Sequence, residues 1–285
     1  MSSDESESDI MMIDATCLRN HEIMNHVYAD MRHDYYLSQD WSKEFYILQA
    51  LRGFIAVGHG KSESMQVLLP QIQTSYCLFD WKHIRENRSV LKQIRSKLRN
   101  YRIKVNYDSD NVLQRIHEYH GRKSWLCSKY RQLCSGMFQH GAMVVEGLPN
   151  ESSSVVFRMC SIGLYNEENV LIAAELGYVM GGTFTSLSGF CERQKNVSVG
   201  KVQILALAQL LSSSGFQFLN LGQPPQKECM QYKIDIGGVE VPRSGFLVRW
   251  NEAIERNPIE LGVFLRYDGS LFDLFRLDES EINLA

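Results

Sequence analysis

The apolar residues of this chain change their spacing near Gly141, from the period of helices to the period of strands. After Gly141, the strand pattern recurs in four segments, at residues 142–145, 154–164, 170–178 and 182–188. The strongest helical pattern of this half follows at 201–213, and an apolar strand follows it at 216–221. A run of strands joined to a helix and a further strand predicts an α+β fold, in which one mixed sheet is flanked by helices.

Helical patterns are more frequent in the half before Gly141. Asp108 is placed to cap a helix at 109–119, and Gly121 is placed to end it. Trp125 opens the next predicted helix, which Gly141 ends. The expected regions are a disordered acidic tail at 1–12, a small N-terminal domain at 13–107 and a larger domain at 108–285.

The composition is that of a globular protein. With 285 residues, the chain has room for one large domain or two small ones, and 44% apolar residues support a sizeable core. An aromatic content of 11% with only six prolines argues against disorder. Apolar runs fall short of the roughly 18 residues of a transmembrane helix, and the start of the chain lacks the pattern of a signal peptide. We expect a cytoplasmic protein without a membrane partner.

The seven cysteines include no CxxC pair, which excludes the common zinc-finger and thioredoxin signatures. Cys127 and Cys134 share one face of the helix predicted after Trp125, so a metal site with His140 is conceivable. Reduced thiols in or near the core are the favoured interpretation, and we therefore predict no metal.

The positive charge of the chain is concentrated in residues 82–104. Nine basic residues and one acidic residue there give a local charge of +8, in a chain whose net charge is −3. A row of these cations on one predicted helix face suits binding along a phosphate backbone, and a solvated helix face is the alternative. The candidate tRNA-binding residues, of which the first four form the row, are Arg88, Lys92, Arg95, Arg99, Arg102 and Lys104.

Five segments resemble, in order and spacing, motifs of the leucyl/phenylalanyl-tRNA–protein transferases. The family motifs are Thr-Trp-Ile, Ala-His-Ser-Val-Glu, Gly-x-x-Phe-x-Gly-Glu-Ser-Met-Phe, Asn-Ala-Ser-Lys and Ser-Leu-Gly-x-x-x-(Ile/Val)-Pro-Arg. The similar segments here are Ser124-Trp125-Leu126, Ala142–Glu146, Gly181–Phe190, Asn196–Ser198 with Lys201, and Asp235–Arg243. Together with the basic segment, the resemblance covers about residues 66 to 250.

The resemblance implies a C-terminal acetyltransferase-like (GNAT-like) domain behind a smaller N-terminal domain. It also implies an aminoacyltransferase, which moves Leu, Phe or Met from an aminoacyl-tRNA to the N-terminus of a protein that begins with Arg or Lys, a modification of the N-end rule (N-degron) type. The implied partners are aminoacyl-tRNA and protein or peptide N-termini. No metal or soluble cofactor is implied, because the charged tRNA is the donor. The sequence leaves open the transferred amino acid, the acceptor residue and the oligomeric state.

Two amides near the end of the 216–221 strand are the candidate catalytic residues. The family's Asp-x-Gln falls on Asn220, Leu221 and Gly222, and a slip of one residue brings Gln223 to the position of the glutamine. Attack on an activated ester requires an oriented amine that loses a proton, and the amides of Asn220 and Gln223 are suited to orienting it. Capping of the strand end by the same amides is the alternative.

Five further residues are candidates for substrate binding. Leu187 stands where the family has the carboxylate associated with the cationic acceptor, and Tyr232 stands near the position of a family histidine. Trp125 and Phe190 are candidates for stacking on the donor adenine or for lining a side-chain pocket, with a place in the core as the alternative. Arg243 is a candidate for binding phosphate or carboxylate, although bracing of a turn is favoured.

A catalytically inactive relative that binds tRNA or protein N-termini is the second hypothesis, because the family's carboxylates are replaced at Leu187 and Asn220. Transferase activity ranks first, since a shifted acid such as Glu192 or Asp235 is available to substitute. An acetyl-CoA acetyltransferase fits less well. Residues 193–200 lack the glycines that free backbone amides to hold a pyrophosphate.

Overall fold

The computed structural model describes residues 10–86, 95–145, 154–193, 198–226 and 230–280. The chain forms two compact units. The first contains the chain up to Thr74 together with Trp125–Leu133, and the second contains Ser75–Ser124 and the chain from Cys134 onward. The boundary that the sequence predicts, at 107/108, differs from this division. The reason is that Ser75–Phe79 and Arg102–Val105 are both strands of the large sheet.

The first unit combines short helices with a two-stranded sheet. Side-chain caps start three of its α-helices. Asp14 accepts a hydrogen bond from the Cys17 N–H at 2.8 Å, Asn20 accepts one from the Glu22 N–H at 2.9 Å, and Ser42 accepts one from the Phe45 N–H at 3.1 Å. The antiparallel strands pair from Ile55 opposite Gln71 to His59 opposite Val67. The elements are α1 (Ala15–Arg19), α2 (His21–Ala29), α3 (Lys43–Leu51), β1 (Ile55–His59), η1 (Glu63–Met65) and β2 (Val67–Gln71).

Trp125–Leu133 belongs to the first unit although it follows strands of the second unit in sequence. Tyr130 is fully buried there, and its hydroxyl lies 2.7 Å from that of Tyr46 on α3. Gln66 accepts hydrogen bonds from the Ser128 hydroxyl and the Lys129 N–H. The first unit is therefore discontinuous in sequence.

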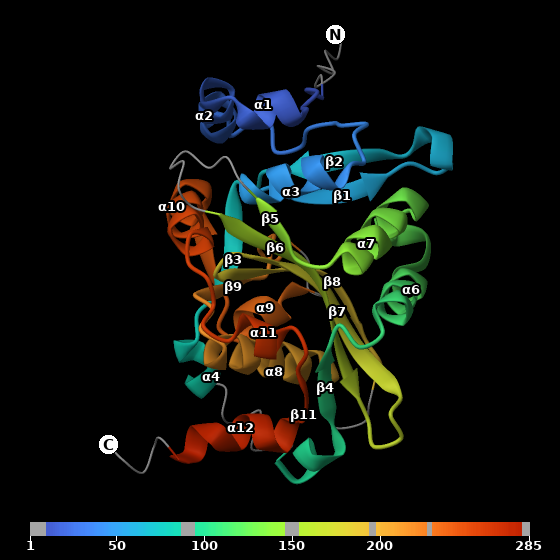
Figure 1. Ribbon diagram of the computed structural model, residues 1–285, viewed down its shortest axis with the longest axis vertical. Helices are drawn as coiled ribbons and strands as arrows, with labels where there is room; N and C mark the ends of the chain where they lie inside the picture. Colours follow the sequence, from blue (N-terminus) through green and yellow to red (C-terminus); the bar gives the residue numbers. More distant parts are fainter. Residues whose placement is uncertain (1–9, 87–94, 146–153, 194–197, 227–229, 281–285) are drawn as a thin grey trace, which may run out of the picture. The chain divides into compact units, whose positions relative to one another are not determined.

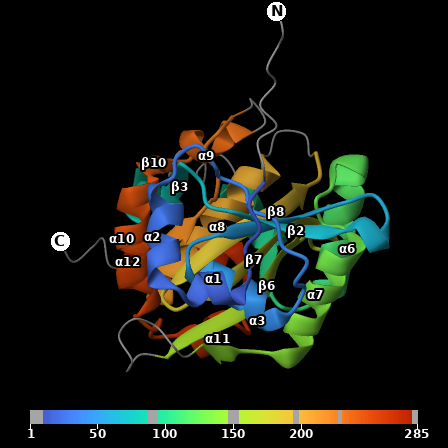
Figure 2. The same cartoon turned by 90° about the horizontal axis from the view of Figure 1, so that it is seen from above.

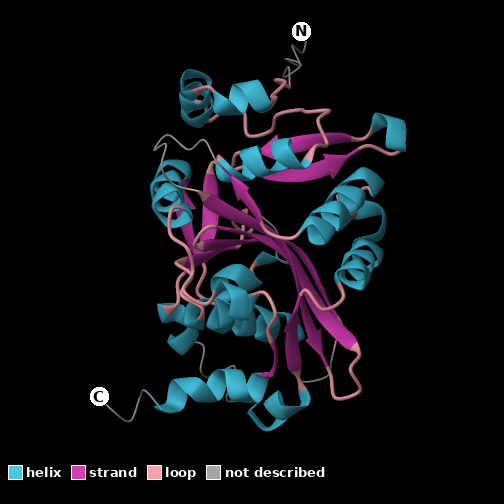
Figure 3. Cartoon of the chain, viewed as in Figure 1, coloured by secondary structure: helices cyan, strands magenta, loops and turns pink. Residues whose placement is uncertain are grey.

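The second unit is built on one mixed sheet, which contains nine strands within the described residues and is drawn in magenta in Figure 3. The strand order is β10-β3-β9-β8-β7-β6-β4-β11, and β5 pairs with the start of β6. Every pair is antiparallel except β8 with β9. The bounds are β3 (Ser75–Phe79), β4 (Arg102–Val105), β5 (Met143–Val145), β6 (Val155–Tyr165), β7 (Leu171–Met180), β8 (Thr183–Cys191), β9 (Phe218–Asn220), β10 (Val239–Pro242) and β11 (Asp268–Ser270).

Helices cover both faces of this sheet (Figures 1 and 2). α6 (Ser109–His120) contacts β6, β7 and β8 on one face, and α8 (Val199–Ser213) contacts β7, β8 and β9 on the other. The alternation of side chains along a strand explains this division. On β6, Ser161 lies 2.9 Å from the hydroxyl of Ser109 on α6, whereas Ile162 packs into the core around α8.

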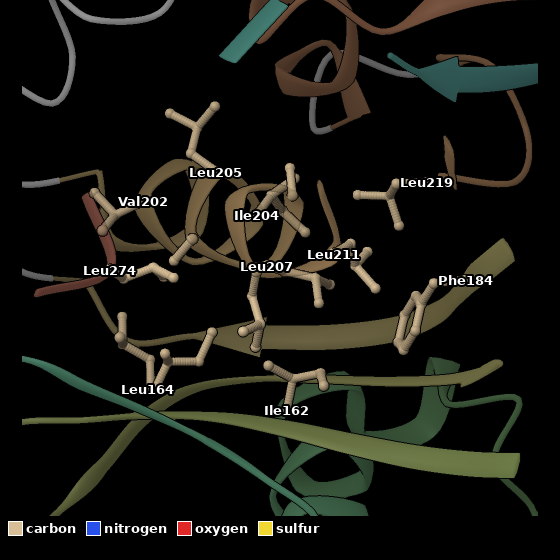
Figure 4. Packing of buried hydrophobic residues seen from close by; sticks show 14 of the residues in the cluster. Ile162, Leu164, Phe184, Val202, Ile204, Leu205, Leu207, Leu211, Leu219 and Leu274 are labelled. Carbon is tan, nitrogen blue, oxygen red and sulfur yellow. The ribbon is translucent and has the colours of Figure 1, made fainter. Parts of the chain in front are cut away.

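α8 is buried around most of its circumference. The apolar stripe of Val202, Leu205, Ala208 and Leu211 is buried. Ile204 and Leu207, which lie off this stripe, are buried as well. Figure 4 shows Leu207 pointing toward Ile162 of β6, with Leu274 of α12 (Leu271–Ser280) nearby. A helix that is apolar all round needs cover on its outer side, and α12 contributes to that cover.

The remaining elements complete the second unit. α10 (Arg243–Ile254) packs against β10 and β3 (Figure 2), where the ring of Phe246 stacks on Tyr76 with 3.6 Å between centroids. Within the described residues, no helix has the length and apolar character required to cross a membrane. The other elements are α4 (Lys82–Glu86), η2 (Arg95–Asn100), η3 (Gly121–Lys123), α7 (Ser128–His140), α9 (Tyr232–Asp235) and α11 (Leu261–Phe264). Residues of α7 up to Leu133 are counted with the first unit.

The α+β fold with a mixed sheet flanked by helices is confirmed. The α6 cap is confirmed as well, since Asp108 accepts from the Asn111 N–H, and Gly121 ends the helix with a φ of +53°. The helix expected to open at Trp125 begins instead at Ser128. The predicted helix that carries the row of cations, at 87–98, lies mostly outside the described residues. Its described end is part of the 3₁₀ helix η2.

Candidate active site

β8 and β9 lie parallel over only a short stretch. Thr183–Thr185 pair with Phe218–Asn220, after which β9 ends and β8 continues to Cys191. α8 is the crossover between the two strands. In open sheets, ligands bind beyond the carboxyl ends of parallel strands. The residues from Ser186 on β8, and those that follow Asn220, therefore frame the candidate site.

Asn220 is buried and holds the end of β9. Its Oδ1 accepts a hydrogen bond from the Gly222 N–H at 2.9 Å, and its Nδ2 donates to Thr185 Oγ1 at 3.4 Å. The Gly222 carbonyl in turn accepts from the Cys77 N–H of β3 at 2.7 Å. Both polar groups of the Asn220 amide are thus engaged in capping the strand end, the alternative that the sequence left open.

Lys233 reaches the same turn from α9. Its ammonium donates to the carbonyls of Leu221 at 2.7 Å and Gln223 at 2.8 Å, and the residue is buried. Burial disfavours the charged form and lowers the pKa of Lys233 from its ordinary value. The backbone after β9 is therefore fixed by a buried cation.

A β-bulge lies at the point where β8 leaves β9. On β7, Leu176 is opposite Ser188 and the next residue, Gly177, is opposite Ser186, so Leu187 is the additional residue. A bulge of this kind re-aims the side chains around it and is common beside active sites. Leu187, the position at which the resemblance implies a carboxylate, is half-buried on this bulge.

Glu175 on β7 provides a carboxyl group beside the bulge. It is buried, and it accepts a hydrogen bond from the Ser186 hydroxyl. A Cβ added at Gly189, opposite it on β8, would collide with Glu175 Oε2. Burial raises the pKa of Glu175 to about 7, against the opposing effects of Ser186 and the Lys233 charge. The site therefore contains an acid that titrates near neutral pH.

The other predicted site residues near these strands are only partly exposed. Gln223 is half-buried and its carbonyl is bound by Lys233, and Tyr232 is half-buried against the core around α8. Phe190 is buried on the α6 side, where the Arg115 guanidinium lies 5.0 Å from its ring centroid. Leu187 thus lies on the bulge of β8, Gln223 and Tyr232 follow β9, and Phe190 packs against α6.

Two predicted residues lie elsewhere. Arg243 is the first residue of α10 and is fully buried, as expected of a side chain that braces a turn. Trp125 is half-buried in the first unit, where its ring meets Tyr130 edge-on at 4.8 Å between centroids.

The basic segment is described only in part. Arg88 and Lys92 lie outside the described residues, and for Arg95 only the backbone is described. Arg99 is exposed and lies 4.3 Å above the ring of Phe272. Cations that face solvent are the ones available to bind phosphates, and Arg99 is such a cation.

Two cations of the basic segment have partners within the second unit. Arg102 forms an exposed ion pair with Asp268 at 2.8 Å. Lys104 is buried, donates to Asn169 at 2.8 Å and lies 3.9 Å from the ring centroid of Tyr107. The ammonium of Lys104 therefore has partners within the second unit.

The two cysteines considered for a metal site are fully or partly buried. Cys134 is fully buried and its pKa is raised by burial, and Cys127 is half-buried. Within the described parts of the chain, no three His, Cys, Asp or Glu side chains are grouped so that they could hold a metal ion.

The sequence interpretation missed Glu175 and Lys233. The available signal for Glu175 was a single carboxylate within Leu171–Met180, a strand that is otherwise uncharged and is buried at every position. An ionisable residue inside such a run has to be paired or functional, because an isolated buried charge is costly. Lys233 carried no comparable signal, since it lies in a short polar helix.

Comparison with known proteins identifies a family. A model of the leucyl/phenylalanyl-tRNA protein transferase family matches residues 78–251, more than half of the chain, from β3 to α10. No curated protein matches. The solved structure of L-PGS from Bacillus licheniformis is similar at 13% identity over 74% of this chain and 70% of that chain, with a TM-score of 0.36 that carries no argument about function. On the family match, this chain belongs to the leucyl/phenylalanyl-tRNA protein transferase family.

Proposed function

We propose that this protein transfers Leu, Phe or Met from an aminoacyl-tRNA to the α-amino group of a protein N-terminus. The observation that carries the proposal is the parting of β8 and β9 after Thr185 and Asn220, within the segment that matches the family. A parallel strand pair joined by α8 also supports the acetyltransferase-like (GNAT-like) architecture for the second unit. The role in an N-degron type modification and a cytoplasmic location belong to the same proposal.

The chemistry makes moderate demands on the protein. The ester that links the amino acid to tRNA is already activated, so the site has to orient an amine, remove its proton and stabilise the developing negative charge on the carbonyl oxygen. Positioning alone supplies a large part of such a rate enhancement. The fixed turn after Asn220, tied down by Lys233, supports a rigid platform for this step.

Residue roles follow the places that the side chains occupy. Asn220 keeps the strand end in place, and Gln223 is proposed to orient the acceptor amine from the turn that follows. Leu187 and Tyr232, both half-buried, are proposed to border the acceptor and aminoacyl side chains.

The aminoacyl-tRNA needs a longer binding surface than the site around β8 and β9 provides. The row of cations at Arg88, Lys92, Arg95 and Arg99 is proposed to bind the tRNA backbone, and Trp125 and Phe190 remain proposed contacts of the donor end. Arg102, Lys104 and Arg243 are proposed to support the fold beneath the substrates, because their guanidinium or ammonium groups are paired or buried.

The test is incubation of the full chain with labelled Leu-, Phe- and Met-tRNA and a panel of peptides that differ in their first residue. Transfer of label to a peptide with a free α-amine, and none to the same peptide after N-terminal acetylation, is the expected result. Absence of transfer to every peptide with all three donors would refute the transferase proposal.

A non-catalytic relative that binds tRNA or a protein N-terminus is the second candidate. It is favoured by the replacement of the family's carboxylates at Leu187 and Asn220. Tight, salt-sensitive tRNA binding without transfer in the same assay would identify it.

A further inference from the structure

A Ser–Glu pair lies at the point where β8 parts from β9. Ser186 is the first residue of β8 beyond its pairing with β9, and its hydroxyl donates to Glu175 on the neighbouring strand. Ser186 is half-buried, whereas Glu175 is buried behind it. The Ser186 hydroxyl is thus the more exposed member of the pair, and the Glu175 carboxyl group is the buried one.

The backbone around the pair is specialised to hold it. The bulge at Leu187 places Ser186 opposite Gly177, so that its side chain shares the α8 face with Glu175. Gly189 leaves the space that Glu175 Oε2 occupies. Gln203 of α8, with its amide oriented so that both of its polar groups are satisfied, accepts from the Glu175 N–H at 2.9 Å. A carboxyl group in the middle of a buried strand is costly to keep, and these features all accommodate it.

Among the described residues, the titratable groups that act on Glu175 or on its partner Lys233 come from β3, β8 and α9. Lys233 of α9 favours its ionised form, and the Cys191 thiol of β8 has its own pKa raised by burial and by the Glu175 charge. Cys77 of β3 interacts with Lys233. Burial is therefore the dominant influence on the pKa of Glu175 and raises it, while the hydrogen bond from Ser186 and the Lys233 charge favour the carboxylate.

We infer that Ser186 and Glu175 form a relay that removes the proton from the attacking amine, an inference that rests on the proposed transferase function. The acceptor nitrogen forms a C–N bond to the ester carbonyl carbon and gives a proton to Ser186 Oγ, while Ser186 gives its own proton to Glu175. The C–O bond to the tRNA ribose then breaks, and the same two groups return the proton to the departing ribose oxygen. Ser186 touches the substrate, and Glu175 is a positioning and proton-holding residue that acts through it.

The test measures single-turnover transfer from aminoacyl-tRNA to a peptide, using the full chain and the variants Glu175→Gln and Ser186→Ala. General-base assistance is worth roughly 10²–10⁴-fold in rate, so both variants should lose a factor in this range above pH 8. Their affinity for aminoacyl-tRNA should stay within about twofold of the wild type, since neither residue lies in the basic segment.

The pH profile separates a relay from a structural role. The acceptor amine also titrates near pH 8, but its contribution cancels when the wild-type rate is divided by the Glu175→Gln rate. This ratio should rise with pH through about 7, where Glu175 is half ionised, and level off above that. A merely structural effect would give a ratio that does not change with pH.

A matched control is available in the same unit. Ser75 donates to Glu240 at 2.5 Å in an exposed Ser–Glu pair between β3 and β10, and the variants Ser75→Ala and Glu240→Gln should leave transfer unchanged. Wild-type rates in folded Glu175→Gln and Ser186→Ala would overturn the relay while leaving the transferase intact. If Glu175→Gln fails to fold, Ser186→Ala decides alone. If the wild type transfers nothing, the proposed function fails, and the relay fails with it.

Discussion

Arg115 on α6 and Glu192 at the end of β8 form an ion pair, with 2.6 Å between Nη2 and Oε1. This pair holds Glu192 on the α6 side of the sheet, whereas Glu175 faces α8. Asp235, the other acid considered as a substitute in the acceptor site, pairs with Lys201 at 2.9 Å. Both acids therefore already have a cationic partner, which argues against either one as a substitute for the family carboxylate at the Leu187 position.

The acceptor preference should follow from Leu187. A cationic N-terminal side chain loses a charge-assisted contact there, which amounts to roughly a tenfold to hundredfold loss of affinity. We expect the wild type to prefer apolar or small first residues over Arg or Lys, and Leu187→Glu to shift the preference toward Arg and Lys. Competition among peptides that differ only in residue one measures this. A strong wild-type preference for Arg or Lys, or a Leu187→Glu variant with unchanged preference, would contradict the prediction.

Gly189→Ala should displace the Glu175 carboxyl group. The new methyl group would collide with Glu175 Oε2, and overpacking of a core costs about 1–3 kcal/mol of unfolding free energy. Transfer activity should fall together with stability, as measured by denaturant unfolding and by the transfer assay. Gly262→Ala is the control, because its Cβ would meet only Arg266 Nη2 at 3.6 Å within a short helix, and it should be neutral or stabilising by up to about 1 kcal/mol. Equal stability of the two variants would count against the packing of Glu175 over Gly189.

The fourfold substitution of Arg88, Lys92, Arg95 and Arg99 by Ala should weaken tRNA binding by orders of magnitude. Each lost phosphate contact reduces the slope of log affinity against log salt by roughly 0.7–0.9, so the slope should flatten measurably. Binding measured at several salt concentrations tests this. A control that removes the same amount of charge replaces four exposed cations elsewhere, Arg19, Lys61, Arg256 and Arg266. Equal effects of the two sets would indicate that only overall charge matters.

Glu175 should make the folded protein less stable as the pH rises toward neutral. Its pKa is 4.5 ordinarily and about 7 in the folded state, so the folded state binds the proton more tightly than the unfolded state does. The contribution of Glu175 to the free energy of unfolding is therefore largest below pH 4.5, falls by roughly 3 kcal/mol as the pH rises to about 7, and is constant above that. Unfolding midpoints from pH 4 to 8 should show this decline in the wild type and a smaller one in Glu175→Gln. If the midpoints of the wild type and of Glu175→Gln changed equally with pH, the pKa of Glu175 would have its ordinary value in the folded protein.

The sequence predicted the sheet region well because the local patterns there agree with the tertiary environment. The strands around 154–164, 170–178 and 182–188 and the helix at 201–213 carry strong periodicity, and all four are present. The helix α12 was missed because Leu271 and Leu274 acquire their burial by packing of this helix onto α8 and η2, which no local pattern reveals.

The site was harder to predict than the fold. Asn220 was found at the correct strand end, but the hydrogen bonds to Gly222 and Thr185 depend on a pairing between segments that are far apart in sequence. The bulge at Leu187 is a property of the register between β7 and β8, which sequence spacing along one strand does not contain. The proximity of Glu175 and Ser186 follows from that register, and so it became visible only in three dimensions.

The discontinuity of the first unit has a consequence for biosynthesis. The ribosome releases residues 10–74 well before Trp125–Leu133, and until then Tyr46 and Gln66 lack the partners that Tyr130 and Ser128 provide. The core of the first unit therefore stays incomplete while β3 and β4 are synthesised. During this interval its apolar surface is exposed, and chaperones bind such surface. A truncated nascent chain stalled after Thr74 should be digested rapidly by protease, and one extended past Leu133 should resist.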